Sequence, residues 1–328
     1  MSDLTMPCRY GFRIVGDCRE ERRLIDWAAA FRAHASCDQR ADLNREAYLS
    51  AFTFPDAFRR HLDENGTTKA YAGPCGAAWL WFDIDADDEP ERGLNESRRL
   101  AAFMADRYQS DGDELLLFFS GAKGFHIGLP LSLCGSPSPA AGFHRVCRKL
   151  AAGLAEAAGV GNDAGVYDAV RAFRAPNSRH PKSGLHKRRL SFDELLHLSL
   201  DGIRKLAVAP APFDIPEPPP MVDRAATDWR EAVEAVEREA AALADRKTNR
   251  DGSTVTRATL AFIRDGAANG DRHRLLYSAA RNLAESGCSP SAVHALLSES
   301  ALNSGLPPKD VRRQIDCGIA DAGKGANP

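Results

Sequence analysis

A proline-dense stretch, Ala207–Val222 (AVAPAPFDIPEPPPMV), divides this chain into two parts of different character. Proline lacks a backbone N–H and has a fixed φ, so it can neither continue a helix nor donate to a sheet ladder. A segment with this many prolines is stiff and extended. We therefore predict a linker at 207–222 between a domain at 1–206 and a second domain at 223–328, and a chain of 328 residues has room for both.

The part before the linker mixes helical and strand patterns, which predicts an α+β domain. Residues 1–70 read mainly as a helical lead-in, with Asn44 as the cap of a helix entering Arg45–Phe58. The run Ala77–Asp85 is short and apolar, as buried strands are. A helix is expected over Glu91–Tyr108.

A hairpin is predicted next, from strands at Leu115–Ser120 and Phe125–Leu131 joined across Gly121–Gly124. An amphipathic helix follows at roughly Ala140–Ala158, and another helical segment lies around Ser191–Leu206.

Everything beyond the linker reads as helix. Ser289-Pro290 and Pro307-Pro308 are typical helix starts, the first with a cap and a first-turn proline. The chain contains no GxxxxGK[ST] phosphate loop, so it has no helicase motor of its own.

Composition narrows the possible classes of protein. The net charge of −2 is not that of a basic nucleic-acid coat, so any nucleic-acid binding must use a local basic stripe. The eight cysteines form no CxxC or CxxH pair, so no zinc site is predicted and free thiols in a reducing cytoplasm are expected. No signal peptide and no apolar run long enough to span a bilayer is evident, so we expect a cytoplasmic protein without a membrane partner.

Three clusters of residues could carry chemistry, and the first is Trp81–Asp85 (WFDID). Side chains alternate along a strand, so Asp83 and Asp85 point the same way. Two carboxylates on one face repel each other unless a cation lies between them, and such oxygen ligands suit magnesium or manganese. The alternative is a strand end that is merely solvated.

The second cluster is Ser120–His126 (SGAKGFH). Its glycines allow close approach of the backbone to a ligand, and Ser120, Lys123 and His126 supply donors for phosphate oxygens. A plain glycine hairpin with a hydrogen-bonded core histidine is the competing interpretation.

The third cluster begins at Asp168 and continues through Arg171–Arg189, which holds seven lysines and arginines and no acid. Its prolines, glycine and histidines favour a polyanion cradle over a solvated surface. Asp168 by itself could equally be a helix or turn cap. In combination, however, three acids and several cations make a complete set for phosphoryl transfer with two metal ions.

These motifs resemble those of the archaeo-eukaryotic primase superfamily. The first family motif, hhhDxD, matches Trp81–Asp85, and the second, SGxxGxH, matches Ser120–His126. The third is a hydrophobic residue and Asp followed by RxPxSxHxK[ST]G, which matches Tyr167-Asp168 and Arg174–Gly184.

The resemblance implies a DNA-template-directed primase-polymerase with an RRM-like core, an additional α/β unit and an all-α C-terminal domain that engages the template. It implies that Mg²⁺ or Mn²⁺, two ions in all, are held by catalytic carboxylates, and that the triphosphate is bound by a second group of side chains. The carboxylates are Asp83, Asp85 and Asp168, and the second group is Ser120, Lys123, His126, Arg174, His180 and Lys182.

The implied partners are a single-stranded DNA template, nucleoside triphosphates and a separate helicase. The zinc-binding insertion of replicative archaeal and eukaryotic primases is missing, which favours the bacterial plasmid and phage branch. Three alternatives stay open: an end-extending or gap-filling repair polymerase, a non-catalytic replication-initiation protein that binds DNA, and a DxD glycosyltransferase.

Overall fold

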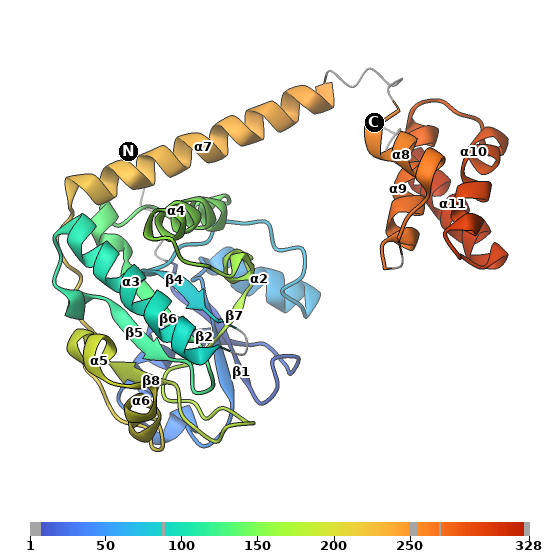
Figure 1. Ribbon diagram of the computed structural model, residues 1–328. Coiled ribbons are helices and arrows are strands. Elements are labelled where there is room, and N and C mark those ends of the chain that lie inside the picture. The colour runs from blue at the N-terminus through green and yellow to red at the C-terminus, as the bar shows by residue number, and fades with distance from the viewer. Residues whose placement is uncertain (1–7, 87–88, 249–254, 269, 325–328) are drawn as a thin grey trace. The chain divides into compact units, whose positions relative to one another are not determined.

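The computed structural model describes residues 8–86, 89–248, 255–268 and 270–324, and its contacts divide the chain into two compact units, Met1–Arg238 and Glu239–Pro328. The first unit mixes helices and strands (Figure 1). The predicted α+β class is therefore confirmed.

Two four-stranded antiparallel sheets form the frame of the first unit. One has the order β2-β1-β3-β7 and consists of β1 (Tyr10–Val15), β2 (Arg23–Asp26), β3 (Ala47–Ser50) and β7 (Ala172–Arg174). The other has the order β4-β6-β5-β8 and consists of β4 (Trp79–Ile84), β5 (Leu116–Phe119), β6 (Phe125–Pro130) and β8 (Arg188–Leu190).

Helices and short 3-10 turns connect these strands. The helices are α1 (Trp27–Ala35), α2 (Asp56–Asn65), α3 (Pro90–Tyr108), α4 (Phe143–Ala158), α5 (Phe192–His197) and α6 (Leu200–Leu206). The 3-10 turns are η1 (Gln39–Ala41), η2 (Gly112–Glu114), η3 (Leu131–Cys134) and η4 (Ala164–Tyr167). The predicted hairpin and the predicted helices at 91–108 and 140–158 correspond to β5–β6, α3 and α4, and are confirmed.

The two sheets pack face to face, and the alternation of β4 explains why. Trp81 lies 5.2 Å from Phe173 of β7, ring centre to ring centre, so this face of β4 meets the first sheet. Leu80, Phe82 and Ile84 point the other way and are fully buried, on the side where α3 and α4 contact β4 (Figure 1). Asp83 is thereby placed on the face between the sheets.

The predicted helical character of residues 1–70 is wrong in large part, because this stretch contributes three strands of the first sheet. The helix expected over Arg45–Phe58 is replaced by β3 and by the start of α2 at Asp56. Ala47 and Leu49 alternate as buried residues of β3, which pairs with β1 and with β7. These long-range pairings override the local helical pattern.

The proline-dense segment 207–222 has no regular secondary structure, but it packs on the first unit instead of hanging free. The N–H of Phe213 donates to the carbonyl of Ala35 at 3.0 Å, and the N–H of Val222 donates to Leu133 at 2.9 Å. The segment is therefore part of the first unit.

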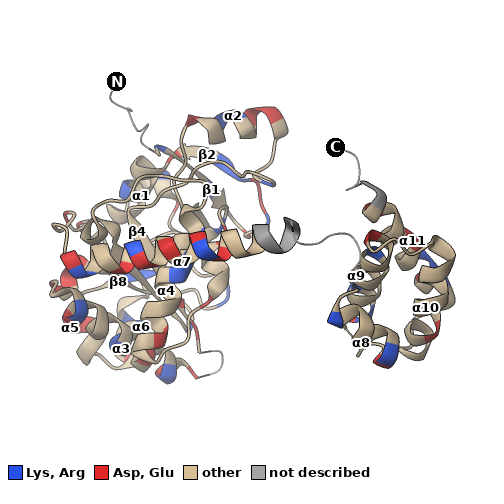
Figure 2. Cartoon of the chain, turned by 90° about the horizontal axis from the view of Figure 1, so that it is seen from above, with Lys and Arg blue, Asp and Glu red and all other residues tan. Residues whose placement is uncertain are grey.

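The division between the units falls inside α7 (Asp223–Thr248), not at the proline segment. Asp228 of α7 is buried and accepts two hydrogen bonds from Arg107 at 2.7 and 2.8 Å, and one from the Tyr108 hydroxyl at 2.9 Å. Acidic and basic side chains are interspersed along this helix (Figure 2). The first part of α7 thus belongs to the first unit.

In the second unit, every described element is a helix: α8 (Arg257–Asp265), α9 (Arg272–Glu285), α10 (Pro290–Asn303) and α11 (Pro308–Lys324). Leu276, Leu297 and Ile315 lie in its own apolar core. The predicted helix starts are confirmed, since the Ser289 hydroxyl caps α10 and Pro308 opens α11.

No helix in the described ranges is both long and apolar enough to cross a bilayer.

Candidate active site

Asp83 and His126 face each other across the β4–β6 ladder. His126 Nε2 lies 3.4 Å from Asp83 Oδ1. Burial, and then the charge of Lys187, lower the pKa of His126 to about 4, although Asp83 opposes this shift. The imidazole is therefore neutral at pH 7, with its Nε2–H donated to the carboxylate. His126 Nδ1 is buried and has no hydrogen-bond partner among the described residues.

Positive surroundings keep Asp83 ionised in a largely buried position. Burial tends to raise the pKa of its carboxyl, but the neighbouring basic groups outweigh burial and hold the pKa below its usual value. These groups are His126, which donates its Nε2–H to the carboxylate, and the side chains of Lys187 and Arg171. Asp83 is thus an anion at neutral pH, as a metal ligand must be.

Lys187 is a fully buried amine between the two sheets. Its Nζ donates to the carbonyl of Arg174 at 2.8 Å and lies 4.5 to 5.4 Å from the ring centres of Phe173, Phe118 and Trp81. Burial lowers the pKa of this amine, and Asp83 opposes that shift. Sequence reasoning placed Lys187 in the basic run expected to form a polyanion cradle, so its internal position was missed.

The glycine hairpin between β5 and β6 contacts Asp85, which lies directly after β4. Lys123 Nζ is 3.4 Å from Asp85 Oδ1. A Cβ on Gly124 would lie 2.9 Å from the carbonyl oxygen of Ile84, so only glycine lets the turn approach β4 this closely.

Ser120 shapes this hairpin. Its hydroxyl oxygen accepts hydrogen bonds from the N–H groups of Gly124 at 3.2 Å and Ala122 at 3.4 Å. Gly121 has a φ of +90°, in the region that favours glycine. The Ser120 hydroxyl still has its own proton to donate to a ligand.

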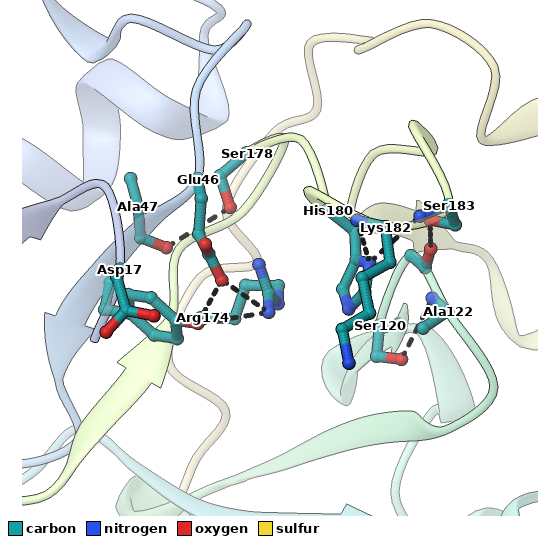
Figure 3. Close-up of polar contacts among 12 residues, drawn as sticks. Asp17, Glu46, Ala47, Ser120, Ala122, Arg174, Ser178, His180, Lys182 and Ser183 are labelled. Atoms are coloured by element: carbon teal, nitrogen blue, oxygen red, sulfur yellow. Dashed lines mark hydrogen bonds and ion pairs between the residues drawn. The ribbon is translucent and has the colours of Figure 1, made fainter. Parts of the chain in front are cut away.

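The loop that carries His180 and Lys182 lies against the same hairpin. His180 Nδ1 accepts from the N–H groups of Lys182 and Ser183, both at 3.3 Å, and the Ser183 hydroxyl donates to the carbonyl of Gly121. In Figure 3 the Lys182 side chain extends toward Ser120. The structure therefore brings the second and third sequence clusters together.

Arg174 is held separately, by residues that sequence reasoning did not select. Its Nη2 lies 3.2 Å from Glu46 Oε1 (Figure 3) and 3.2 Å from the Tyr48 hydroxyl. Its Nη1 is buried and has no hydrogen-bond partner in the described part of the chain.

Asp168 does not join Asp83 and Asp85. Among the described residues, no group of three or more His, Cys, Asp or Glu side chains is placed to hold a metal ion, so the predicted triad is not gathered, and neither is a triad with Asp163 in place of Asp168. Asp168 is exposed and lies at the C-terminal end of η4, where its backbone N–H donates to the carbonyl of Gly165, and its carboxylate opposes the lowering of the pKa of His144 by burial and Arg145. The carboxylate that caps η4 is that of Asp163, which accepts from the N–H of Gly165 at 2.8 Å.

Asp163 lies closer to the site. Its N–H donates to the carbonyl of Asp83 at 3.3 Å, and its carboxylate is 3.7 Å from Arg171. The motif pattern requires a hydrophobic residue before the acid, which selected Tyr167-Asp168 and passed over Asp163, because Asn162 precedes it.

The basic run Arg171–Arg189 does not form one continuous surface. Arg189 points inward and donates to the carbonyls of Leu115 at 2.9 Å and Leu117 at 3.4 Å, and burial lowers its pKa to about 10. Lys182 is exposed, in contrast to the buried Lys187. The predicted polyanion cradle is therefore smaller than the run of sequence that suggested it.

No protein-family model matches the chain, and no curated protein matches its sequence. Among solved structures, the chain is similar to the crystal structure of primase RepB′, with 11% identity and a TM-score of 0.39, over 99% of this chain and 96% of that one. A structural similarity this weak does not assign the chain to a family.

Proposed function

We propose that the chain is a DNA-template-directed primase-polymerase that joins nucleotides by two-metal nucleotidyl transfer. One observation carries this proposal: the hairpin Ser120–Gly124 contacts two functional groups at once. Through Lys123 it meets the carboxylate of Asp85, and through Gly121 it meets the His180–Ser183 loop. A carboxylate that would bind a metal ion and a loop that would bind a triphosphate therefore both contact this one turn.

The donor set fits Mg²⁺ or Mn²⁺. Mg²⁺ usually keeps several waters and is held by one or two carboxylates together with phosphates of the substrate, so a site does not need three gathered acids. Asp83 and Asp85 would supply these carboxylates, and we assign Asp163, instead of Asp168, as the third. Two such ions, when bound, activate the 3′-hydroxyl and steady the leaving pyrophosphate.

The chain's own residues would bind and orient the reactants. His126 holds the Asp83 carboxylate through Nε2. Ser120, Lys123, His180 and Lys182 would donate to triphosphate oxygens, because hydroxyl, ammonium and imidazole groups are suitable donors. Little covalent chemistry is asked of the protein, so positioning and charge dominate catalysis.

The succession β4-α3-β5-β6-α4 supports an RRM-like core, because it matches the first five elements of β-α-β-β-α-β split βαβ folds. The last strand of this sheet, β8, follows only after β7 of the other sheet and pairs with β5. We propose that the helical second unit engages the single-stranded template, and that a separate helicase opens the duplex. A chain that ends at residue 238 should then extend primers but initiate poorly. Equal initiation by both chains would rule out this role.

The test is synthesis on single-stranded circular DNA with labelled nucleotides and either Mg²⁺ or Mn²⁺. The control is Asp83→Ala combined with Asp85→Ala. Short new products from the wild type alone support a primase. Extension of a supplied primer without new starts would instead indicate an end-extending polymerase. DNA binding without any synthesis would indicate a replication-initiation protein.

A further inference from the structure

Glu46 lies next to Arg174, and its carboxylate contacts the Arg174 guanidinium. It directly precedes β3, in which Tyr48 pairs with Arg174 of β7. The Arg174 guanidinium lies over the Tyr48 ring, 5.0 Å from its centre. Because side chains two residues apart share a face of a strand, Glu46 and Tyr48 both reach Arg174.

The contacts among these side chains fix the guanidinium through a single nitrogen. Arg174 Nη2 lies 3.2 Å from both Glu46 Oε1 and the Tyr48 hydroxyl, and that hydroxyl donates to the same Glu46 oxygen. The side chains of Arg174 and Glu46 are only 13% and 14% exposed. Burial and Glu46 raise the pKa of Tyr48, so its hydroxyl stays a donor at neutral pH.

The other terminal nitrogen of the guanidinium, Nη1, takes no part in these contacts. Arg174 Nη1 is buried, and no described residue accepts a hydrogen bond from it. An unsatisfied buried donor is unfavourable, so it indicates a partner that binds later. A guanidinium suits phosphate oxygens in particular.

The backbone on both sides of Glu46 holds the loop that leads to His180. The carbonyl of Ala47 accepts from the N–H of Ala175 at 2.9 Å and from the Ser178 hydroxyl at 3.3 Å, and the carbonyl of Arg45 accepts from the N–H of Arg179 at 3.2 Å. Figure 3 shows Glu46, Ala47 and Ser178 on one side of Arg174 and His180 on the other. One short segment thus supports both groups expected to meet the triphosphate.

We infer that Glu46 is a positioning residue of the nucleotide site: its carboxylate anchors Arg174 through Nη2 so that Nη1 is presented to a nucleoside triphosphate. This inference rests on the proposed function. The direction of the change in nucleotide affinity distinguishes this role from simple electrostatics, because an acid near a triphosphate would by charge alone weaken binding. Removal of Glu46 should therefore loosen nucleotide binding if it positions Arg174, and tighten binding if it only repels.

The experiment is a double-mutant cycle on the full chain, with Glu46→Ala, Arg174→Ala and the double variant. Binding of a non-hydrolysable deoxynucleoside triphosphate with Mn²⁺ is measured by calorimetry, and kcat and KM are measured by single-nucleotide primer extension. Glu46→Gln keeps an acceptor at the same place and serves as the conservative variant. Glu64→Ala removes an exposed glutamate and serves as the matched control.

We expect Glu46→Ala to weaken nucleotide binding about tenfold and to raise KM more than it lowers kcat, because a charged hydrogen bond that orients Arg174 is lost. Glu46→Gln should recover most of the affinity. In the Arg174→Ala background the Glu46 substitution should have no further effect. Thermal unfolding of each variant shows whether the fold is kept.

Unchanged or tighter nucleotide binding by a folded Glu46→Ala variant would overturn the inference but not the proposed function. The same would follow if Glu46→Ala reduced the nucleotide affinity equally in the wild-type and Arg174→Ala backgrounds. Should Glu46→Ala fail to fold, Glu46→Gln combined with Tyr48→Phe tests the same anchor, and undiminished binding by that variant overturns it. If the wild type binds no triphosphate, the proposed function and this inference fall together.

Discussion

The hydroxyl of Tyr167 donates a hydrogen bond of 2.7 Å to the backbone carbonyl of Trp81. This bond fastens η4 to β4, and Asn162 in turn donates to the Tyr167 hydroxyl at 3.0 Å. The turn that begins at Asp163 is thereby held beside Asp83, whereas Asp168 lies past the Tyr167 anchor, at the C-terminal end of η4.

The position of the third carboxylate can be tested directly. Asp163→Ala should lower nucleotidyl transfer by about a thousandfold, because a metal-binding carboxylate contributes several kcal/mol to the transition state. Asp168→Ala should retain most of the activity. Primer extension by the two variants, with thermal unfolding to confirm their fold, makes the comparison. The opposite ranking would restore Asp168 to the metal site.

The hairpin turn makes a second prediction. Gly121→Ala should destabilise the protein by about 1–2 kcal/mol, because alanine is disfavoured at a φ of +90°. Its new Cβ would also lie 3.1 Å from the carbonyl oxygen of Leu185 and disturb the His180 loop. The matched control is Gly153→Ala in α4, where a Cβ meets nothing within 4 Å.

Helix propensity should make that control slightly more stable, by about 0.5–1 kcal/mol. Urea unfolding measures both changes, and nucleotide binding should weaken only for Gly121→Ala. Equal stability and equal nucleotide affinity of the two variants would contradict the assigned role of the turn.

Stability should depend on pH between about 4 and 6.5, because burial is the first cause that lowers the pKa of both His34 and His126 to about 4. In this range the unfolded chain binds protons that the folded chain does not. The free energy of unfolding therefore falls as the pH drops, by up to about 1.4 kcal/mol per pH unit for each histidine.

Urea unfolding at pH 7 and pH 5 measures this loss. The His126→Asn variant should lose less stability between the two pH values than the wild type does, since one of the two groups is absent. The same loss in both proteins would show that His126 does not contribute.

The docking of α7 can be tested through Asp228. Asp228→Ala leaves Arg107 and the Tyr108 hydroxyl without their shared acceptor, so the first unit should lose about 3 kcal/mol. The second unit has its own core and should unfold at an unchanged temperature. Calorimetry that resolves the two transitions checks this. A shift of the second transition would mean that the two units are coupled.

The sequence predicted the parts of this fold that are locally determined. The apolar run ending at Asp83, the Gly121–Gly124 hairpin and the cap of α10 at Ser289 all carry their signal within a few residues. The strand β3 does not, because Ala47 and Leu49 become strand residues only through pairing with distant β1 and β7.

In the candidate site, too, the sequence predicted only what a local motif encodes. Ser120, Lys123, His180 and Lys182 were selected from motifs, and the structure brings their segments together. Glu46 and Lys187 gain their positions from tertiary contacts that no spacing rule contains. Asp163 was passed over because the motif pattern weighed the residue before the acid and not the hydrogen bonds of the turn.

The chain passes from one sheet to the other between β7 and β8. Within those few residues, Ala175 and Arg179 are bonded to the β3 side, while the Ser183 hydroxyl is bonded to the β5–β6 hairpin. The segment between β7 and β8 is hydrogen-bonded to both sheets, so neither sheet can unfold without breaking the bonds between this segment and the other sheet. The two sheets should therefore melt as one cooperative body, and a cut or insertion at 175–187 should abolish folding and nucleotide recognition together.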